Sequence, residues 1–136
     1  MNSDEKYGFK KLIVYQKAYK LAMDIFEATK SFPSDERFAL ISQIRRSSRS
    51  VCVNLAEGYG KRKYPKHFIN KLTDSDSECS ETSVHLDFSR DCKYISEKMH
   101  AEFQSVNREI GKILGYMLEH PEKFLPKKNN NSSFQK

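Results

Sequence analysis

Apolar residues recur at intervals of three and four along most of this chain, which is the spacing of an amphipathic helix. No segment shows the strict alternation that is typical of a strand. We expect helices at about residues 9–30, 34–57, 65–91 and 96–120. Because helices of roughly 20 to 30 residues joined by short links favour antiparallel neighbours, the sequence predicts an all-α protein, an up-down-up-down antiparallel four-helix bundle.

Each predicted helix has a stripe of core positions. They are Leu12, Tyr15, Tyr19, Ala22, Met23 and Phe26 in the first helix; Ile41, Ile44, Ser48, Val51 and Leu55 in the second; Phe68, Leu72, Ser75, Cys79, Thr82 and Leu86 in the third; and Met99, Phe103, Val106, Ile110, Ile113 and Met117 in the fourth. The small residues in the third stripe would let a neighbouring helix approach closely.

Short polar segments separate the helices. Pro33 ends the first, and Ser34 with two following acids is suited to cap the second. Gly58 is expected to take the left-handed conformation that ends the second helix, and Ser96 to cap the fourth. We therefore expect a helical domain over residues 1–120 and a disordered polar tail over residues 121–136.

Composition limits the protein to one domain with one core. The chain has 136 residues, of which 38% are hydrophobic and 31% are charged. Cys52, Cys79 and Cys92 form no CxxC pair, which favours reduced thiols over a disulfide framework or a zinc site. No stretch approaches the roughly 20 apolar residues of a membrane span, and the first residues lack an apolar signal region. We expect a cytoplasmic protein without membrane contact or a cofactor.

Positive charge is concentrated in the first half of the chain. The net charge of +6 divides into +8 for residues 1–73, from fifteen Lys and Arg against seven Asp and Glu, and −2 for residues 74–136, from nine against eleven. This asymmetry indicates either an anionic partner or head-to-tail contacts between protomers.

Three arginines share one face of the second helix. Arg45, Arg46 and Arg49 fall within roughly a quarter turn, apart from the apolar stripe. One interpretation is pairing with an acidic stripe on the third helix, within a protomer or across a subunit interface. The other is contact with phosphate. The acidic residues are Asp74, Glu78 and Glu81.

The link between the second and third helices is a stronger candidate for nucleic-acid binding. It carries Lys61, Arg62 and Lys63, with Lys66 just beyond and tyrosines on both sides. Mobile cations beside aromatic rings suit backbone contacts and base stacking. The first helix adds a lysine face, with Lys10 and Lys17 as candidates. The alternative for both groups is an ordinary solvated surface.

Candidates for catalysis are few. The four histidines have no paired metal-binding spacing, so we expect no metal site. Arg62 and His67 fit R-x4-H, a pattern seen in HEPN-type ribonucleases, which are also helical bundles. There is no glycine-rich phosphate loop and no arrangement that suggests a nucleophile.

Four segments carry a resemblance to a known family. They are FKKLIVYQKAYKLA, FPSDE, the run QIRRSSRSVCVNLAEG from Gln43 to Gly58, and a segment with Glu78, Glu81 and Thr82. Over residues 9 to about 118 the chain resembles the four-helix bundle proteins encoded in intervening sequences of 23S ribosomal RNA genes. That family is similar in fold to the accessory variability determinant of diversity-generating retroelements, a homopentameric barrel that binds nucleic acid and a reverse transcriptase.

The resemblance implies a non-enzymatic bundle that assembles as a pentamer and binds nucleic acid through a basic surface. A reverse transcriptase is an implied partner, and a pure protein-interaction scaffold is the alternative function. The family's motif residues are Arg45, Arg46, Asn54, Glu57 and Gly58. We interpret Asn54 and Glu57 as closing hydrogen bonds to the loop that follows them.

Overall fold

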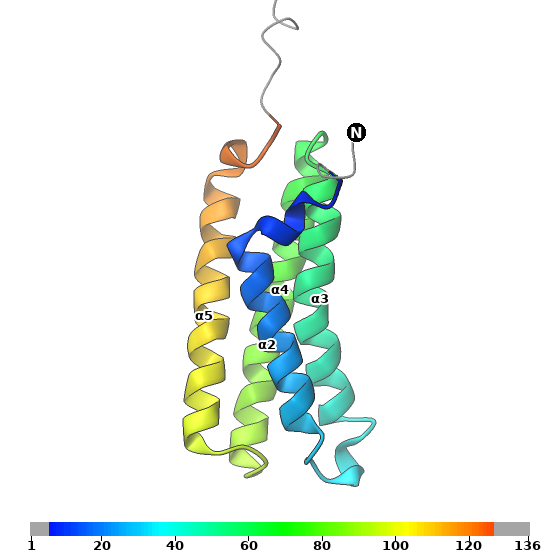
Figure 1. Cartoon of the computed structure of the whole chain (residues 1–136), viewed down its shortest axis with the longest axis vertical. Helices are drawn as coiled ribbons and strands as arrows, with labels where there is room; N and C mark the ends of the chain where they lie inside the picture. The colour runs from blue at the N-terminus through cyan, green and yellow to red at the C-terminus, as the bar shows by residue number, and fades with distance from the viewer. Residues whose placement is uncertain (1–5, 127–136) are drawn as a thin grey trace, which may run out of the picture.

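Helices are the regular elements of the structure, a computed structural model that describes residues 6–126 (Figure 1). The four long helices lie side by side and confirm the predicted four-helix bundle. In chain order the elements are η1 (Gly8–Lys11), α2 (Ile13–Thr29), η2 (Ser34–Glu36), α3 (Leu40–Gly60), α4 (Pro65–Asp91), α5 (Glu97–Glu119) and η3 (Pro121–Lys123). None of the helices in this part of the chain combines the length and apolar character needed to cross a membrane.

Each long helix packs against two others. The most extensive contact joins α3 to α4, followed by α4 with α5, α2 with α3, and α2 with α5. Helices α2 and α4 therefore stand at opposite corners of the bundle, and Figure 1 shows α2 in front of α4.

The interface between α3 and α4 is narrow because small polar residues line it. Every predicted core position of these two helices is buried. The Ser75 hydroxyl donates to the Val51 carbonyl oxygen at 2.8 Å, and the Ser47 and Thr82 hydroxyls lie 2.8 Å apart. Pairing these buried polar groups across the interface avoids the cost of leaving them unsatisfied.

Gly58 has a different role from the predicted one. The expectation that it ends the second helix in a left-handed conformation is wrong, because α3 continues to Gly60 and no glycine among the described residues has a positive φ. A Cβ atom at position 58 would lie 2.9 Å from the Cβ atom of Lys71. At Gly58, α3 and α4 are therefore too close for a side chain to fit between them without a shift.

The N-terminal helix is shorter than predicted. Leu12 is extended, with φ −68° and ψ 129°, and it separates η1 from α2. The second helix also starts later, at Leu40, because Ser34 to Glu36 form the separate turn η2. The Glu36 carboxylate still supports the start of α3 by accepting a hydrogen bond from the Leu40 N–H at 3.4 Å.

The predicted core stripe of α2 is displaced around the helix. Val14, Ala18, Leu21 and Ile25 are buried together with Ala22, whereas the predicted core residues Tyr19 and Met23 are 54% and 44% exposed. Apolar residues cover more than one side of this helix, so periodicity alone did not identify the inward side.

Helix α5 begins at the predicted residue, but its buried face differs in part from the predicted one. Ser96 caps it, with its hydroxyl accepting from the Met99 N–H at 3.0 Å. Ile110 and Met117 are buried, but the innermost face also includes Gln104 and Asn107. Both amides donate to α4: Asn107 Nδ2 to the Cys79 carbonyl and Gln104 Nε2 to the Ser83 carbonyl, each at 2.9 Å. These partners explain why two polar residues occupy core positions.

The chain remains ordered just beyond α5. Residues 121–126, which the sequence assigns to the tail, include the turn η3, and Phe124 and Leu125 pack against the core. Residues 127–136, the rest of the predicted tail, lie outside the described residues.

Candidate nucleic-acid interface and apolar groove

The three arginines of α3 do not act as one group. Arg46 pairs with α4: its Nη1 donates to Glu78 Oε2 at 2.7 Å, and its Nη2 bonds to the Glu81 carboxylate. The bond to Glu78, aided by the charge of both carboxylates, raises the pKa of Arg46 above its ordinary value. The predicted interhelical pairing therefore exists within one protomer at Arg46. Asp74 forms no ion pair with any of the three arginines in the described part of the chain.

Arg45 turns to α2 instead of α4. Its Nε donates to Thr29 Oγ1 at 2.8 Å and its Nη2 to the Phe26 carbonyl at 3.4 Å. The guanidinium carbon also lies 4.6 Å from the centre of the Phe26 ring. Because Phe26 and Thr29 are in the last turn of α2, Arg45 supplies a cation where helix carbonyls lack intrahelical partners. The prediction that Arg45 pairs with an acidic residue of the third helix is therefore wrong.

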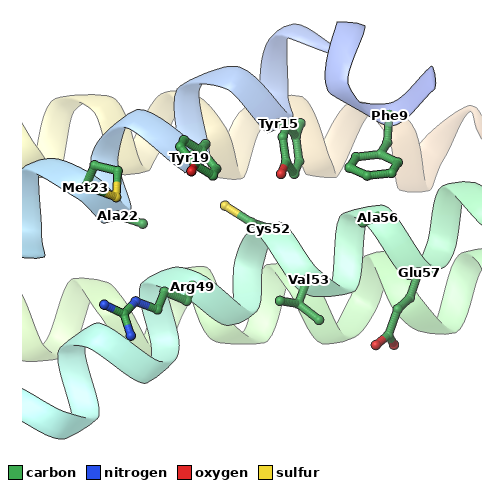
Figure 2. A pocket seen from close by; sticks show the side chains of 10 residues that line it. All are labelled: Phe9, Tyr15, Tyr19, Ala22, Met23, Arg49, Cys52, Val53, Ala56 and Glu57. Atoms are coloured by element: carbon green, nitrogen blue, oxygen red, sulfur yellow. The ribbon is translucent and has the colours of Figure 1, made fainter. Parts of the chain in front are cut away.

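Arg49 forms fewer contacts with described residues than Arg45 or Arg46 does. Its guanidinium carbon lies 5.6 Å from the centre of the Phe26 ring, and the side chain forms no ion pair with a carboxylate of residues 6–126. Arg49 is exposed at one end of an apolar groove between α2 and α3 (Figure 2).

The basic link contains one anchored cation, Arg62, and exposed lysines. Arg62 donates from Nε to the Tyr59 carbonyl at 2.9 Å and from Nη1 to the Phe124 carbonyl at 3.3 Å, and its guanidinium stacks 3.6 Å above the Tyr59 ring centre. Lys61, Lys63 and Lys66 are exposed. Arg62 therefore connects the link to Phe124, which follows η3. The three lysines face solvent.

The two lysines predicted as binding candidates on the first helix also differ, because one is paired and the other is exposed. Lys17 forms a 2.9 Å ion pair with Glu109 of α5. Lys10 lies in η1, exposed, with its ammonium 5.5 Å from the centre of the Tyr7 ring. A Cβ atom at Gly8 would lie 3.1 Å from the Tyr59 ring, so η1 rests against the end of α3. Lys10 thereby joins the basic link, and Lys17 does not.

These contacts define a basic end of the bundle, formed by η1 and the α3–α4 link (Figure 1). Two exposed tyrosines accompany its cations: Tyr7 is 49% exposed and Tyr64 is 61% exposed. None of the exposed lysines at this end forms an ion pair with a described carboxylate. They are Lys6, Lys10, Lys11, Lys61, Lys63 and Lys66.

The two residues of the R-x4-H pattern have different partners in the structure. Arg62 is directed at two backbone carbonyls, whereas His67 lies edge-on to Tyr64, with ring centres 6.0 Å apart. No hydrogen bond joins Arg62 to His67 in the described residues. Elsewhere, His100 Nε2 lies 2.8 Å from Asp87 Oδ1, an interaction between α4 and α5.

An apolar groove of about 440 Å³ runs between α2 and α3 (Figure 2). Phe9, Tyr15, Tyr19 and Met23 form one wall, and Val53 with Ala56 lies on the other. Cys52 is at the floor, where burial raises the pKa of its thiol to about 12 and keeps it neutral. The sequence pattern does not reveal this groove, because it predicts Tyr19 and Met23 as core residues.

Comparison with known proteins places the chain in a family. Residues 10–116 match the sequence profile described as 23S rRNA-intervening sequence protein. The chain belongs to this family. A similar solved structure is that of a protein of unknown function from the S23 ribosomal protein family of Bacteroides thetaiotaomicron, with 26% identity and a TM-score of 0.72 over 79% of this chain and 96% of that one. A comparison with curated proteins gave no match.

In this chain, most residues of the family motif on α3 serve helix packing. Asn54 Nδ2 donates to the Ser50 carbonyl one turn earlier at 3.0 Å, and Glu57 forms a 2.8 Å ion pair with Lys71 of α4. The interpretation that both residues bond to the following loop is therefore wrong. Glu57, Gly58 and Arg46 contact α4, whereas the Asn54 amide bonds within α3.

Proposed function

We propose that this chain is a non-enzymatic, cytoplasmic, homo-oligomeric four-helix bundle that binds RNA or DNA backbone through its basic end. The pentameric state that we propose rests on the resemblance to the accessory variability determinant. The observation that carries the binding proposal is the set of six exposed lysines at one end of the bundle, free of described carboxylate partners.

The chemistry of this end fits a polyanion better than a small ligand. Lysine ammonium groups on flexible stems act as mobile point charges, which suits a phosphate backbone without fixed sequence. Tyr7 and Tyr64 offer exposed rings on which unpaired bases can stack. An oligomer would bring several such ends to one nucleic acid and raise its apparent affinity.

A salt titration tests this proposal. We expect affinity for a mixed-sequence RNA or DNA to fall steeply between about 50 and 200 mM salt, because bound lysines release counterions from phosphate. A triple variant, Lys61→Gln, Lys63→Gln and Lys66→Gln, is expected to weaken binding and reduce the salt dependence. Its matched control places the same charge change elsewhere, at Lys30, Lys98 and Lys112. Equal losses in the two triple variants would argue against a localised site.

RNA integrity in these samples tests the non-enzymatic part of the proposal. We expect the wild-type protein to leave a structured RNA intact. Cleavage that disappears in a His67→Ala variant would instead support the ribonuclease pair.

A pure protein-interaction scaffold is the second candidate, and the apolar groove favours it. Exposed aromatic and aliphatic side chains mark contact surfaces for proteins more often than for nucleic acid. A reverse transcriptase is one partner of this kind. No binding of RNA or DNA even at about 50 mM salt would favour the scaffold over the nucleic-acid binder.

A further inference from the structure

The tyrosine rings of the basic end differ in how accessible they are. The Arg62 guanidinium stacks 3.6 Å from the centre of the Tyr59 ring, and Gly8 lies against the same ring. The Tyr7 ring has two lysine ammonium groups near it, each 5.5 Å from its centre. A planar ligand such as a nucleic-acid base could therefore stack on Tyr59 or Tyr7 only by competing with these cations.

Tyr64 presents a more accessible ring. It is 61% exposed, and no lysine or arginine of residues 6–126 lies over its ring. Its contact with His67 is edge-on, with ring centres 6.0 Å apart and ring planes at 90°. One perpendicular neighbour covers no more than one face of a ring, so the other face of Tyr64 is open to a stacking partner.

The backbone of Tyr64 is held in place on both sides of the residue. Tyr64 precedes Pro65, which disfavours the helical region for it, and its φ is −120° and its ψ 87°. Its N–H donates to the Lys61 carbonyl at 2.8 Å, and its carbonyl accepts from the His67 and Phe68 N–H groups at 2.9 and 3.0 Å. A ring on a fixed backbone loses less conformational freedom when it binds a ligand.

Exposed lysines lie on both sides of Tyr64 in the chain. Lys61 and Lys63 precede it, and Lys66 follows it. Their ammonium groups attract phosphates whether or not the strand is paired. The ring is more selective, because the bases of a duplex already stack on one another, whereas an unpaired base can leave its neighbours and stack on an aromatic side chain. Tyr64 can therefore add affinity for an unpaired strand that the lysines alone do not supply.

We infer that Tyr64 stacks on an unpaired base and makes the basic end bind single-stranded RNA or DNA more tightly than a duplex. This inference rests on the proposed function, nucleic-acid binding through the basic end. It adds the form of nucleic acid that is preferred and the residue that selects it.

Substitutions at Tyr64 test the inference. The probes are a mixed-sequence single strand and the duplex of that strand with its complement, each in RNA and in DNA, at about 50 mM salt. Tyr64→Leu keeps an apolar side chain without an aromatic face, and Tyr64→Phe keeps the ring without the hydroxyl. Tyr19→Leu is the matched control, because Tyr19 is 54% exposed and lies in the groove between α2 and α3. Circular dichroism checks that each variant is folded.

We expect the wild-type protein to bind the single strand more tightly than the duplex. Tyr64→Leu should weaken single-strand binding by about 5-fold or more, the loss expected for one stacked base, and leave duplex binding unchanged. Tyr64→Phe and Tyr19→Leu should bind both probes as wild type does.

A tryptophan at position 64 gives a second measurement. The chain has no tryptophan, so Tyr64→Trp introduces a single fluorescent reporter. Stacking on a base should quench its emission when the single strand binds, and saturating duplex should leave the emission unchanged. Tyr19→Trp is the control, and its emission should respond to neither probe.

The outcomes separate this inference from the proposed function. A wild-type protein that binds neither probe would overturn nucleic-acid binding by the basic end, and the inference with it. Equal affinity for single strand and duplex in both RNA and DNA would overturn the inference alone. So would an equal loss for both probes in Tyr64→Leu, or a Tyr64→Phe variant that binds the single strand as weakly as Tyr64→Leu does.

Discussion

Gly58 lies against Lys71 so closely that a Cβ atom at position 58 would be 2.9 Å from Lys71 Cβ. Lys71 Cβ is attached directly to the backbone of α4, so it cannot move aside as the end of a flexible side chain could. Two helix backbones must separate to admit one methyl group. This contact makes the glycine of the family motif a packing residue.

Gly58→Ala is therefore expected to destabilise the protein. Overpacking costs about 1–3 kcal/mol, and the better helix propensity of alanine returns only about 1 kcal/mol. Urea unfolding measures the difference. Gly115→Ala is the control, because nothing lies within 4 Å of a Cβ atom there, and it should stabilise the helix. Equal effects at the two positions would contradict the close approach of α3 and α4.

Replacing each of the three arginines of α3 with alanine should change the free energy of unfolding by a different amount. Arg45→Ala is expected to lower the free energy of unfolding by about 1–2 kcal/mol, because it removes the bonds to Thr29 and Phe26 at the end of α2. Arg46→Ala should cost about 0.5–1 kcal/mol, since its ion pairs are partly exposed. Arg49→Ala should leave the unfolding of the monomer unchanged. Chemical denaturation of the three variants at one salt concentration checks this order, and a largest loss at Arg49 would contradict it.

Stability should decrease in acid partly because of Asp87. The hydrogen bond from His100, aided by Gln104 and the charge of Arg90, lowers the pKa of Asp87 below its ordinary value of 3.8. A carboxyl group with a lowered pKa in the folded state stabilises that state above its unfolded pKa, and this contribution is lost as pH falls through the folded pKa. Asp87→Asn should therefore be less stable than wild type at neutral pH.

The stability difference between Asp87→Asn and wild type should shrink as the pH falls below the ordinary carboxyl range. Unfolding by urea at a series of pH values measures it. Asp35→Asn, an exposed carboxylate in η2, provides the comparison. A difference that stays constant with pH would show that the two folded-state bonds of Asp87 do not favour its ionised form.

The three cysteines should differ in reactivity. Burial raises the pKa of the Cys52 thiol to about 12 and that of the Cys79 thiol to about 11, whereas Cys92 is exposed. Because the thiolate is the reactive form, an alkylating reagent should modify Cys92 alone in the folded protein and all three after unfolding. Mass spectrometry after digestion identifies the sites. Rapid labelling of Cys52 in the native state would mean that the groove floor opens to solvent.

The fold class was predictable from the sequence because helical periodicity is a local property. All the predicted core positions of α3 and α4 are buried, including Ser75 and Thr82, but the buried faces also include Ser47, Cys52 and Ser89, which the prediction left out. The prediction failed on α2, where apolar residues cover more than one side. Which side faces inward there depends on where α3 and α5 stand, and that information is not local.

The candidate site was predictable only in part, for the same reason. The sequence by itself determined the helices, the family motif and the presence of a basic link. The tertiary structure alone decided that Arg62 is anchored to Phe124, that Lys17 is paired with Glu109, and that Lys10 lies beside the link. It also turned Tyr19 and Met23 outward to form the groove. Residue type and spacing determine what each helix can contact. Partners far apart in the sequence meet only when the helices pack. Packing therefore decides which cations and apolar side chains stay exposed on the described surface.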